Sequence, residues 1–122
     1  MARNNARATY VDGIRFASGW EARRYKELKL LEKAGKIKDL RLQPKFVLVK
    51  GFKYNGKTVR QMSYFADFIY YDCERKMTII EDVKGRREQV YINKVKIFLR
   101  KLIDGEYEKE YGKDLKFEEV IY

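Results

Sequence analysis

The sequence has 122 residues, of which 45% are hydrophobic and 38% are charged, so it has room for one folded domain with a modest core. Lysine and arginine number 28 against 18 acidic residues, and the net charge of +10 indicates a polyanionic partner such as nucleic acid. One cysteine and no histidine exclude an internal disulfide, a multi-cysteine zinc site, a serine triad and histidine-based nuclease chemistry.

The amino-terminal segment lacks export and membrane signals. Its first ten residues, MARNNARATY, have no apolar signal-peptide core, and no run in the chain approaches the roughly 18 apolar residues of a spanning helix. We therefore expect a cytoplasmic protein without a membrane partner. One domain is expected over 1–122, with residues 1–8 as a flexible basic arm because Arg3 and Arg7 stand among small and polar residues.

A short hairpin and a helix are predicted next in the chain. YVDGIRF at 10–16 contains Asp12-Gly13, a two-residue turn signal between apolar strands. Ser18 and Glu21 have the spacing of a capping box and predict a helix over 18–34, which ends at Gly35. Apolar residues recur at helical spacing in this helix: Trp20, Tyr25, Leu28 and Leu31.

From residue 40 the apolar period changes to two. The segments RLQPKFVLVKGFKY and KTVRQMSYFADFIYYD flank Asn55-Gly56 and predict a long antiparallel hairpin, with Pro44 at an edge or at the start of a strand. A third strand is predicted over 76–84 and a closing strand in LKFEEVIY. Between them, a helix over 88–104 has an apolar side and a basic outer side. Its apolar side is formed by Tyr91, Val95, Phe98, Leu99 and Leu102.

Two acidic residues interrupt the apolar pattern of these strands. Asp67 shares a strand face with Phe65 and Ile69, and alternation in TIIEDVKG places Asp82 and Lys84 on one face. A buried carboxylate without a partner is costly, and two converging carboxylates repel each other unless a cation joins them. If the two strands are neighbours, Asp67 and Asp82 therefore predict a site for a hard cation such as Mg²⁺.

The order helix, three strands, helix, strand, together with Glu21, Ala66-Asp67 and Asp82-Val83-Lys84, resembles the PD-(D/E)XK nuclease superfamily. The resemblance covers roughly residues 16–121 and, through EARRYKELKLLEKAGKI, LQPKF, YFADFIYYD and EDVKG, extends to small phage and prophage proteins placed in that superfamily. It implies an α/β (α+β) fold with a restriction-endonuclease-like αβββαβ core, a central mixed sheet flanked by helices. Ala66 stands where the superfamily's name has proline, a position without a chemical role.

The resemblance also implies roles for individual residues. Asp67, Asp82 and the Val83 carbonyl would hold Mg²⁺, with Mn²⁺ as a substitute, and Glu21 would serve the water shell or a second ion. Lys84 would orient or activate the attacking water and offset phosphate charge. The implied activity is a metal-dependent DNA endonuclease of a phage or prophage, acting on branched DNA as a Holliday-junction resolvase or flap nuclease, and by analogy a homodimer. The alternative is a non-catalytic nucleic-acid-binding domain on the same fold.

Each site residue also has a simpler interpretation. Glu21 can be the N3 acid of the capping box, and Asp67 can be a partly exposed acid paired with Arg60. Asp82 and Lys84 can form an ion pair on a solvated edge. Glu81 is expected on the opposite face unless a bulge exchanges it with Asp82. Gln43 is a candidate to touch the site from the neighbouring strand, and its simpler interpretation is a plain strand glutamine.

Basic and aromatic residues are candidates for contact with DNA. The basic ones either form a solvated face or contact phosphates, and the tip of the hairpin at 51–57 would help to grip duplexes. The DNA-binding candidates are Arg86, Arg87, Lys94, Lys96, Lys101, Lys53 and Lys57. The aromatic candidates for stacking on exposed bases are Tyr54, Tyr64 and Tyr91.

Overall fold

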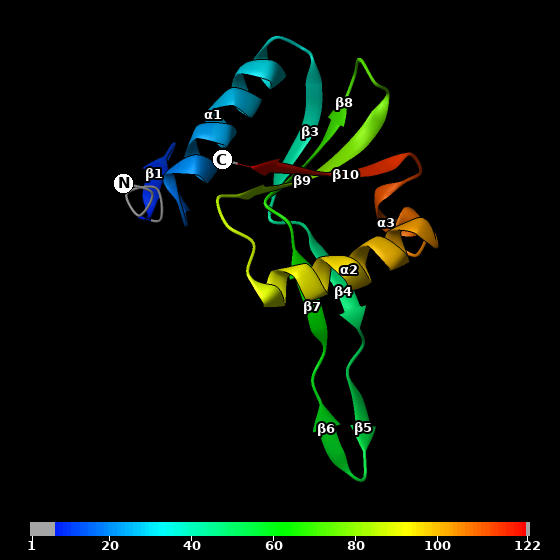
Figure 1. Cartoon of the computed structure of the whole chain (residues 1–122). Coiled ribbons are helices and arrows are strands. Elements are labelled where there is room, and N and C mark those ends of the chain that lie inside the picture. The colour runs from blue at the N-terminus through cyan, green and yellow to red at the C-terminus, as the bar shows by residue number, and fades with distance from the viewer. Residues whose placement is uncertain (1–6, 122) are drawn as a thin grey trace.

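The computed structural model describes residues 7–121 of the chain (Figure 1). Residues 1–6 of the predicted basic arm lie outside the described residues, and Arg7 and Ala8 are exposed. The helices are α1 (Gly19–Lys33), α2 (Gln89–Ile103) and α3 (Glu108–Tyr111). The strands are β1 (Thr9–Val11), β2 (Ile14–Phe16), β3 (Ile37–Leu42), β4 (Lys45–Val49), β5 (Phe52–Tyr54), β6 (Lys57–Val59), β7 (Met62–Phe65), β8 (Phe68–Asp72), β9 (Met77–Lys84) and β10 (Leu115–Ile121).

A mixed sheet forms the centre of the molecule. Within residues 7–121 it has four strands in the order β10-β9-β8-β3, with β10 parallel to β9 and the other neighbours antiparallel. Apolar residues of α1 pack on one face of this sheet, and apolar residues of α2 pack on the other. The predicted α/β class and the predicted order of helix, three strands, helix and strand are both confirmed.

The helix and turn signals in the sequence act locally. The Ser18 hydroxyl accepts a hydrogen bond of 3.2 Å from the Glu21 backbone N–H, so Ser18 caps α1 as predicted. Asp12-Gly13 joins β1 to β2 and Asn55-Gly56 joins β5 to β6. All four turn residues have φ between 49° and 77°, the left-handed region that two-residue hairpin turns require. Both predicted hairpins are therefore present.

The long strand predicted up to Asp72 is divided, and this changes the place of Asp67. β7 ends at Phe65 and β8 begins at Phe68, so Ala66 and Asp67 lie in a break between them. β7 pairs with β4, whereas β8 pairs with β3 and β9. Phe65 is 54% exposed, so the predicted buried row shared by Phe65 and Asp67 is wrong. The chain changes partners at this break because β4 and β7 leave the central sheet together.

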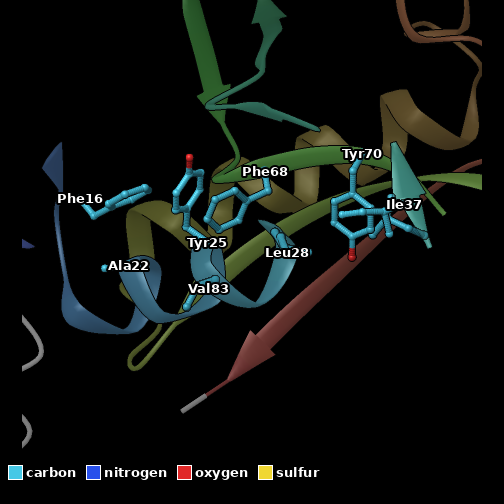
Figure 2. Packing of buried hydrophobic residues seen from close by; sticks show 9 residues of the cluster. Phe16, Ala22, Tyr25, Leu28, Ile37, Phe68, Tyr70 and Val83 are labelled. Carbon is cyan, nitrogen blue, oxygen red and sulfur yellow. The ribbon is translucent and has the colours of Figure 1, made fainter. Parts of the chain in front are cut away.

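Two hydrophobic clusters hold the helices on the sheet. The cluster under α1 joins the helix to β2, β3, β8 and β9, and Figure 2 shows its aromatic rings between α1 and the sheet. It contains Phe16, Ala22, Tyr25, Leu28, Ile37, Phe68, Tyr70, Ile79 and Val83. The cluster under α2 contains Phe46, Leu48, Tyr64, Ala66, Ile69, Ile80, Val95, Phe98 and Tyr107. Odd residues of β9 therefore face α1 and even residues face α2, as alternation predicts.

Helix α2 differs in one respect from its predicted pattern. Val95 and Phe98 are buried, but Leu99, predicted on the apolar side, is 36% exposed. Ile92 and Ile103 are also exposed, so the outer surface of the helix carries apolar as well as basic residues. In the described part of the chain, no helix has the length and apolar character that a membrane crossing requires.

Candidate active site

Asp67 and Asp82 converge where β9 ends. The Asp67 Oδ2 atom accepts a hydrogen bond of 2.7 Å from the Val83 backbone N–H, which draws the carboxylate from the strand break towards β9. Asp82, on β9, accepts a short hydrogen bond from the Tyr64 hydroxyl through Oδ2. Asp67 is 9% exposed and Asp82 is 1% exposed, so the alternative of a partly exposed Asp67 paired with Arg60 is wrong.

Burial disfavours ionisation of both carboxyls, and nearby negative charges add to this effect at Asp67. Burial, followed by the charges of Asp82 and Glu21, raises the pKa of Asp67 to about 8. Burial also raises the pKa of Asp82, although its contacts with Tyr64 and Lys84 act in the opposite direction. Without a cation, the pair therefore retains a proton at neutral pH that isolated aspartates would have lost.

Lys84 lies beside this pair, on the same face of β9 as Asp82. Its Nζ is 3.1 Å from Asp82 Oδ1 and 4.5 Å from the centre of the Tyr91 ring. The predicted ion pair is present, but it is not on a solvated edge because Asp82 is buried. With a side chain that is 29% exposed, the Lys84 ammonium is accessible from outside while its other neighbours orient it.

Glu21 faces the same region from the first turn of α1. It lines a cavity of about 360 Å³ together with Asp67 and Gln43. Burial raises the pKa of Glu21, the charge of Lys84 lowers it and the charge of Asp82 raises it, so the three groups interact electrostatically. The capping interpretation is also correct for the backbone, since Ser18 accepts from the Glu21 N–H. The cap uses the backbone N–H of Glu21 and leaves its carboxylate available, so capping does not exclude a role of the carboxylate at the site.

Tyr64 and Gln43 lie at this site in other ways than their favoured sequence interpretations predicted. Tyr64, a predicted base-stacking residue, is 4% exposed and donates to Asp82, so it cannot stack on DNA. Gln43 is not a plain strand residue: its φ is 50°, and its backbone N–H donates to the Asp67 carbonyl oxygen at 2.9 Å. Tyr64 stands two residues after Met62 and three before Asp67 within one apolar segment, and this local pattern contains no signal of its partner on β9.

The opposite face of β9 carries another buried acid, Glu81, and both of its carboxylate oxygens accept hydrogen bonds. Glu81 faces α1 as alternation predicts, where Arg24 Nε and Nη2 contact its two oxygens at 2.5 and 3.0 Å. The Tyr70 hydroxyl donates to Glu81 Oε2 at 2.7 Å. This fork joins α1 to β9 one turn after Glu21, so it restrains the helix that presents Glu21 to the site.

The predicted DNA-binding residues fall into two groups. Arg86, Arg87 and Lys96 are exposed near or on α2, and Lys53 and Lys57 are exposed on the β5–β6 hairpin. Lys94 instead donates to the Ser63 carbonyl at 3.0 Å, and Lys101 is paired with Glu106 at 3.1 Å. Tyr91 donates to Glu119 at 2.5 Å and holds Lys84 over its ring, so stacking of its ring on a base would displace Lys84.

The donor atoms suit a hard divalent cation, although no group of three or more acidic, cysteine or histidine side chains in residues 7–121 is arranged to hold one. Asp82 Oδ1 is buried and has no hydrogen-bond partner in the described residues, since its contact with Lys84 is an ion pair without hydrogen-bond geometry. Such an oxygen beside a second carboxylate is a chemical fit for Mg²⁺. Asp67, Asp82 and the Val83 carbonyl would hold the ion, with water completing its shell.

Comparisons with known proteins add a family but no activity. Among curated proteins and solved structures, no match was found. One family model matches residues 1–119, which is nearly the whole chain. The chain therefore belongs to the family described as "Protein of unknown function (DUF1064)".

Proposed function

We propose that the protein is a Mg²⁺-dependent DNA endonuclease that hydrolyses phosphodiester bonds. The observation that carries the proposal is the buried pair of Asp67 and Asp82, with the Asp82 Oδ1 atom buried and 3.1 Å from the Lys84 ammonium. The order of elements and the resemblance to the PD-(D/E)XK superfamily support it. Branched DNA as substrate and a homodimeric enzyme follow from the resemblance and from the need to cut two strands.

Each residue has a distinct part in this proposal. A bound Mg²⁺ would lower the pKa of a water and offset charge on the phosphate oxygens. Asp67 and Asp82 would hold the ion from rigid positions, one anchored by the Val83 N–H and the other by the Tyr64 hydroxyl. Lys84 places a positive charge next to Asp82, where it can orient the attacking water or stabilise the charged phosphate.

The electrostatics of the surface agree with a nucleic-acid substrate. Arg86 and Arg87 follow Gly85 at the end of β9, the strand that carries Asp82 and Lys84. The Arg86 side chain is 84% exposed and the Arg87 side chain is 55% exposed, so both can reach phosphates beside the site. Their ion pairs with Glu88 and Glu119 are 3.4 and 3.7 Å long and solvated, and therefore weak enough to be exchanged for phosphate contacts.

A cleavage assay tests the proposal. Linear, nicked, flapped and four-way-junction DNA are incubated with wild type, Asp82→Asn and Lys84→Ala, with Mg²⁺, Mn²⁺ or EDTA. We expect wild type to cut at least one substrate when metal is present, and both variants to lose at least about a hundredfold in rate. Asp104→Asn is the matched control because Asp104 is an acid at the far end of α2, paired at 3.3 Å with exposed Arg100.

Two results would contradict the proposal. Equal cleavage by wild type and Asp82→Asn would show that a contaminating nuclease produced the products. A wild-type protein that binds these DNAs and cuts none of them would support the alternative of a non-catalytic binding domain. DNA binding by Asp82→Asn separates the two roles, because removal of one negative charge at the site should not weaken binding to a polyanion.

A further inference from the structure

The β4–β7 and β5–β6 strand pairs form a long hairpin that projects from the body of the molecule (Figure 1). We call residues 49–62 of this hairpin the finger. Every residue of the finger is exposed. None of them belongs to either hydrophobic cluster, so these side chains contribute little to packing of the core. The exposed side chains of the finger therefore need an explanation other than stabilisation of the fold.

One face of the finger concentrates large apolar side chains. Phe52 and Tyr54 alternate with Lys53 along β5, so both rings lie on one face. Their cross-strand partners, which share that face, are Val59 and Lys57. Phe52 is 50% exposed, Tyr54 is 68% exposed and Val59 is 38% exposed. Two adjacent aromatic rings are thus presented to solvent on a hairpin that ends in a tight Asn-Gly turn.

The charges of the finger are all of one sign. Within 49–62 the sequence has four basic residues and no acid, and the acid-free stretch extends from residue 40 to residue 66. The basic residues of the finger are Lys50, Lys53, Lys57 and Arg60. A second copy of this chain carries +10 and would be repelled by such a surface, whereas a polyanion would be attracted.

We propose that the finger binds unpaired bases of DNA at a branch or fork, with Phe52 and Tyr54 stacking on the bases and the surrounding cations contacting phosphates. Aromatic rings beside positive charge are the combination by which proteins hold single-stranded nucleic acid. Paired bases in a linear duplex offer edges in the grooves, and the faces of their rings are covered by their neighbours. The aromatic face therefore selects DNA whose bases are unstacked.

The position of the finger connects it to the candidate active site. β7 returns from the finger and ends two residues before Asp67, so at about 3.3 Å per residue the aromatic face lies within roughly 30 Å of that carboxylate. One branched DNA molecule can reach both places. As a statement about which DNA is selected for cleavage, this inference rests on the proposed function, but the binding preference itself does not require cleavage.

Binding measured in EDTA tests the inference. Fluorescence anisotropy compares a forked duplex that has unpaired bases at its branch with a linear duplex of the same length. For Phe52→Ala/Tyr54→Ala we expect about a tenfold weaker affinity for the fork, and less than about a twofold change for the linear duplex. A 2-aminopurine at the branch should be quenched by wild type and stay bright with the double variant.

Two further variants distinguish stacking by the aromatic rings from the effects of apolar contact area and of positive charge. Phe52→Leu/Tyr54→Leu keeps an apolar face without rings and should lose fork preference as the alanine pair does. Lys53→Gln/Lys57→Gln should weaken binding to both DNAs equally and lower the salt dependence. All these positions lie outside both hydrophobic clusters, so the variants should fold, and thermal unfolding checks this.

Three outcomes would overturn the inference. These are equal losses on fork and linear duplex, leucine variants that bind the fork as wild type does, and wild type without preference for the fork. A change from dimer to monomer in the alanine pair, seen by light scattering, would assign the face to contact between copies. Cleavage is measured separately: a wild type that prefers the fork but cuts nothing refutes the endonuclease and leaves the finger's role intact.

Discussion

The Val83 backbone N–H donates a 2.7 Å hydrogen bond to the Asp67 carboxylate, across the point where the chain leaves β7 and enters β8. This bond brings an acid from an irregular segment to the end of a regular strand. It places Asp67 next to Asp82, the residue before Val83, and the pKa of Asp67 is raised first by burial and then by the charge of Asp82. The candidate site therefore depends on the break in the strand as much as on the strand itself.

The carboxyl pair should make stability depend on pH in an unusual direction. The pKa of Asp67 is about 8 in the folded protein and about 3.8 in the unfolded chain, so between these values the folded state binds the extra proton. The free energy of unfolding in EDTA should therefore fall as pH rises from about 5.5 to about 8, by a few kcal/mol at most. Urea denaturation at a series of pH values measures this change in the free energy of unfolding.

Asp67→Asn should flatten this profile and be more stable than wild type at pH 8, because an amide oxygen can still accept from Val83 without ionising. Mg²⁺ should stabilise wild type more at high pH than at low pH. The sequence has no histidine, and the lowered pKa values of Asp72 and Glu118 act below this window. The raised pKa values of Asp82 and Glu21 act in the same direction as that of Asp67. A flat wild-type profile would argue against the repulsive pair.

Tyr64 should tune the affinity for the metal without taking part in the reaction. Tyr64→Phe removes the hydroxyl that donates to Asp82, which should raise the pKa of Asp82 and leave a ligand oxygen without its orienting bond. We expect about a tenfold higher Mg²⁺ concentration for half-maximal cleavage, with the rate largely recovered at saturation. Thermal shift against Mg²⁺ gives the same affinity without a cleavage assay.

Tyr107→Phe is the control for this substitution. Tyr107 is also a buried tyrosine of the α2 cluster, and its hydroxyl donates to the Val47 carbonyl at 2.9 Å, away from the acids. It should lose a similar amount of stability and leave the Mg²⁺ dependence unchanged. Identical Mg²⁺ titrations of Tyr64→Phe and wild type would show that Tyr64 has no role in metal binding.

Arg24 should matter for stability more than an exposed arginine does. Arg24→Ala leaves the carboxylate of Glu81, which is 1% exposed, without its forked partner, so the free energy of unfolding should fall by about 3 kcal/mol. Arg100→Ala, which breaks the exposed pair with Asp104, should cost less than about 1 kcal/mol. Chemical denaturation of both variants makes the comparison.

A double substitution distinguishes two causes of the stability loss in Arg24→Ala: a buried charge without its partner, and lost packing. Arg24→Met combined with Glu81→Leu, in a Tyr70→Phe background that leaves no hydroxyl without its acceptor, removes both charges together and should recover most of the lost stability, because no charge remains buried between α1 and β9. If the double variant is as unstable as Arg24→Ala, the loss comes from packing of the α1 face and the ion pair is not its cause.

Gly85 should be required for close packing between β9 and the start of α1. A β-carbon at this position would lie 1.8 Å from the Trp20 ring, so Gly85→Ala should lower the free energy of unfolding by about 2 kcal/mol. The shift of Trp20 would also move its neighbour Glu21, so activity should fall further than stability explains. Thermal unfolding and the cleavage assay measure the two effects.

Gly51→Ala is the matched control, because its β-carbon would meet only ordinary contacts at 3.5 Å in the finger. It should change the unfolding temperature by little. Equal effects of the two substitutions would mean that Gly85 acts through backbone flexibility and that contact with Trp20 is irrelevant.

The sequence by itself determined the features that depend on neighbours along the chain. Ser18 predicted the start of α1, the Asp-Gly and Asn-Gly pairs predicted both hairpin turns, and alternation predicted that Asp82 and Lys84 share a face opposite Glu81. These features are set by local backbone geometry and by a side-chain period of two residues. They are therefore readable without knowledge of the partner segments.

Only the tertiary structure decided which distant groups meet. The break at Asp67, the Tyr64 bond to Asp82, the Arg24 fork on Glu81 and the exposed finger all depend on where β4 and β7 leave the sheet and where α1 packs. A buried polar group must find a partner, but that partner can lie 57 residues away, as it does for Arg24 and Glu81. The local sequence pattern predicts that a buried polar group needs a partner. Packing of the whole chain determines which residue that partner is.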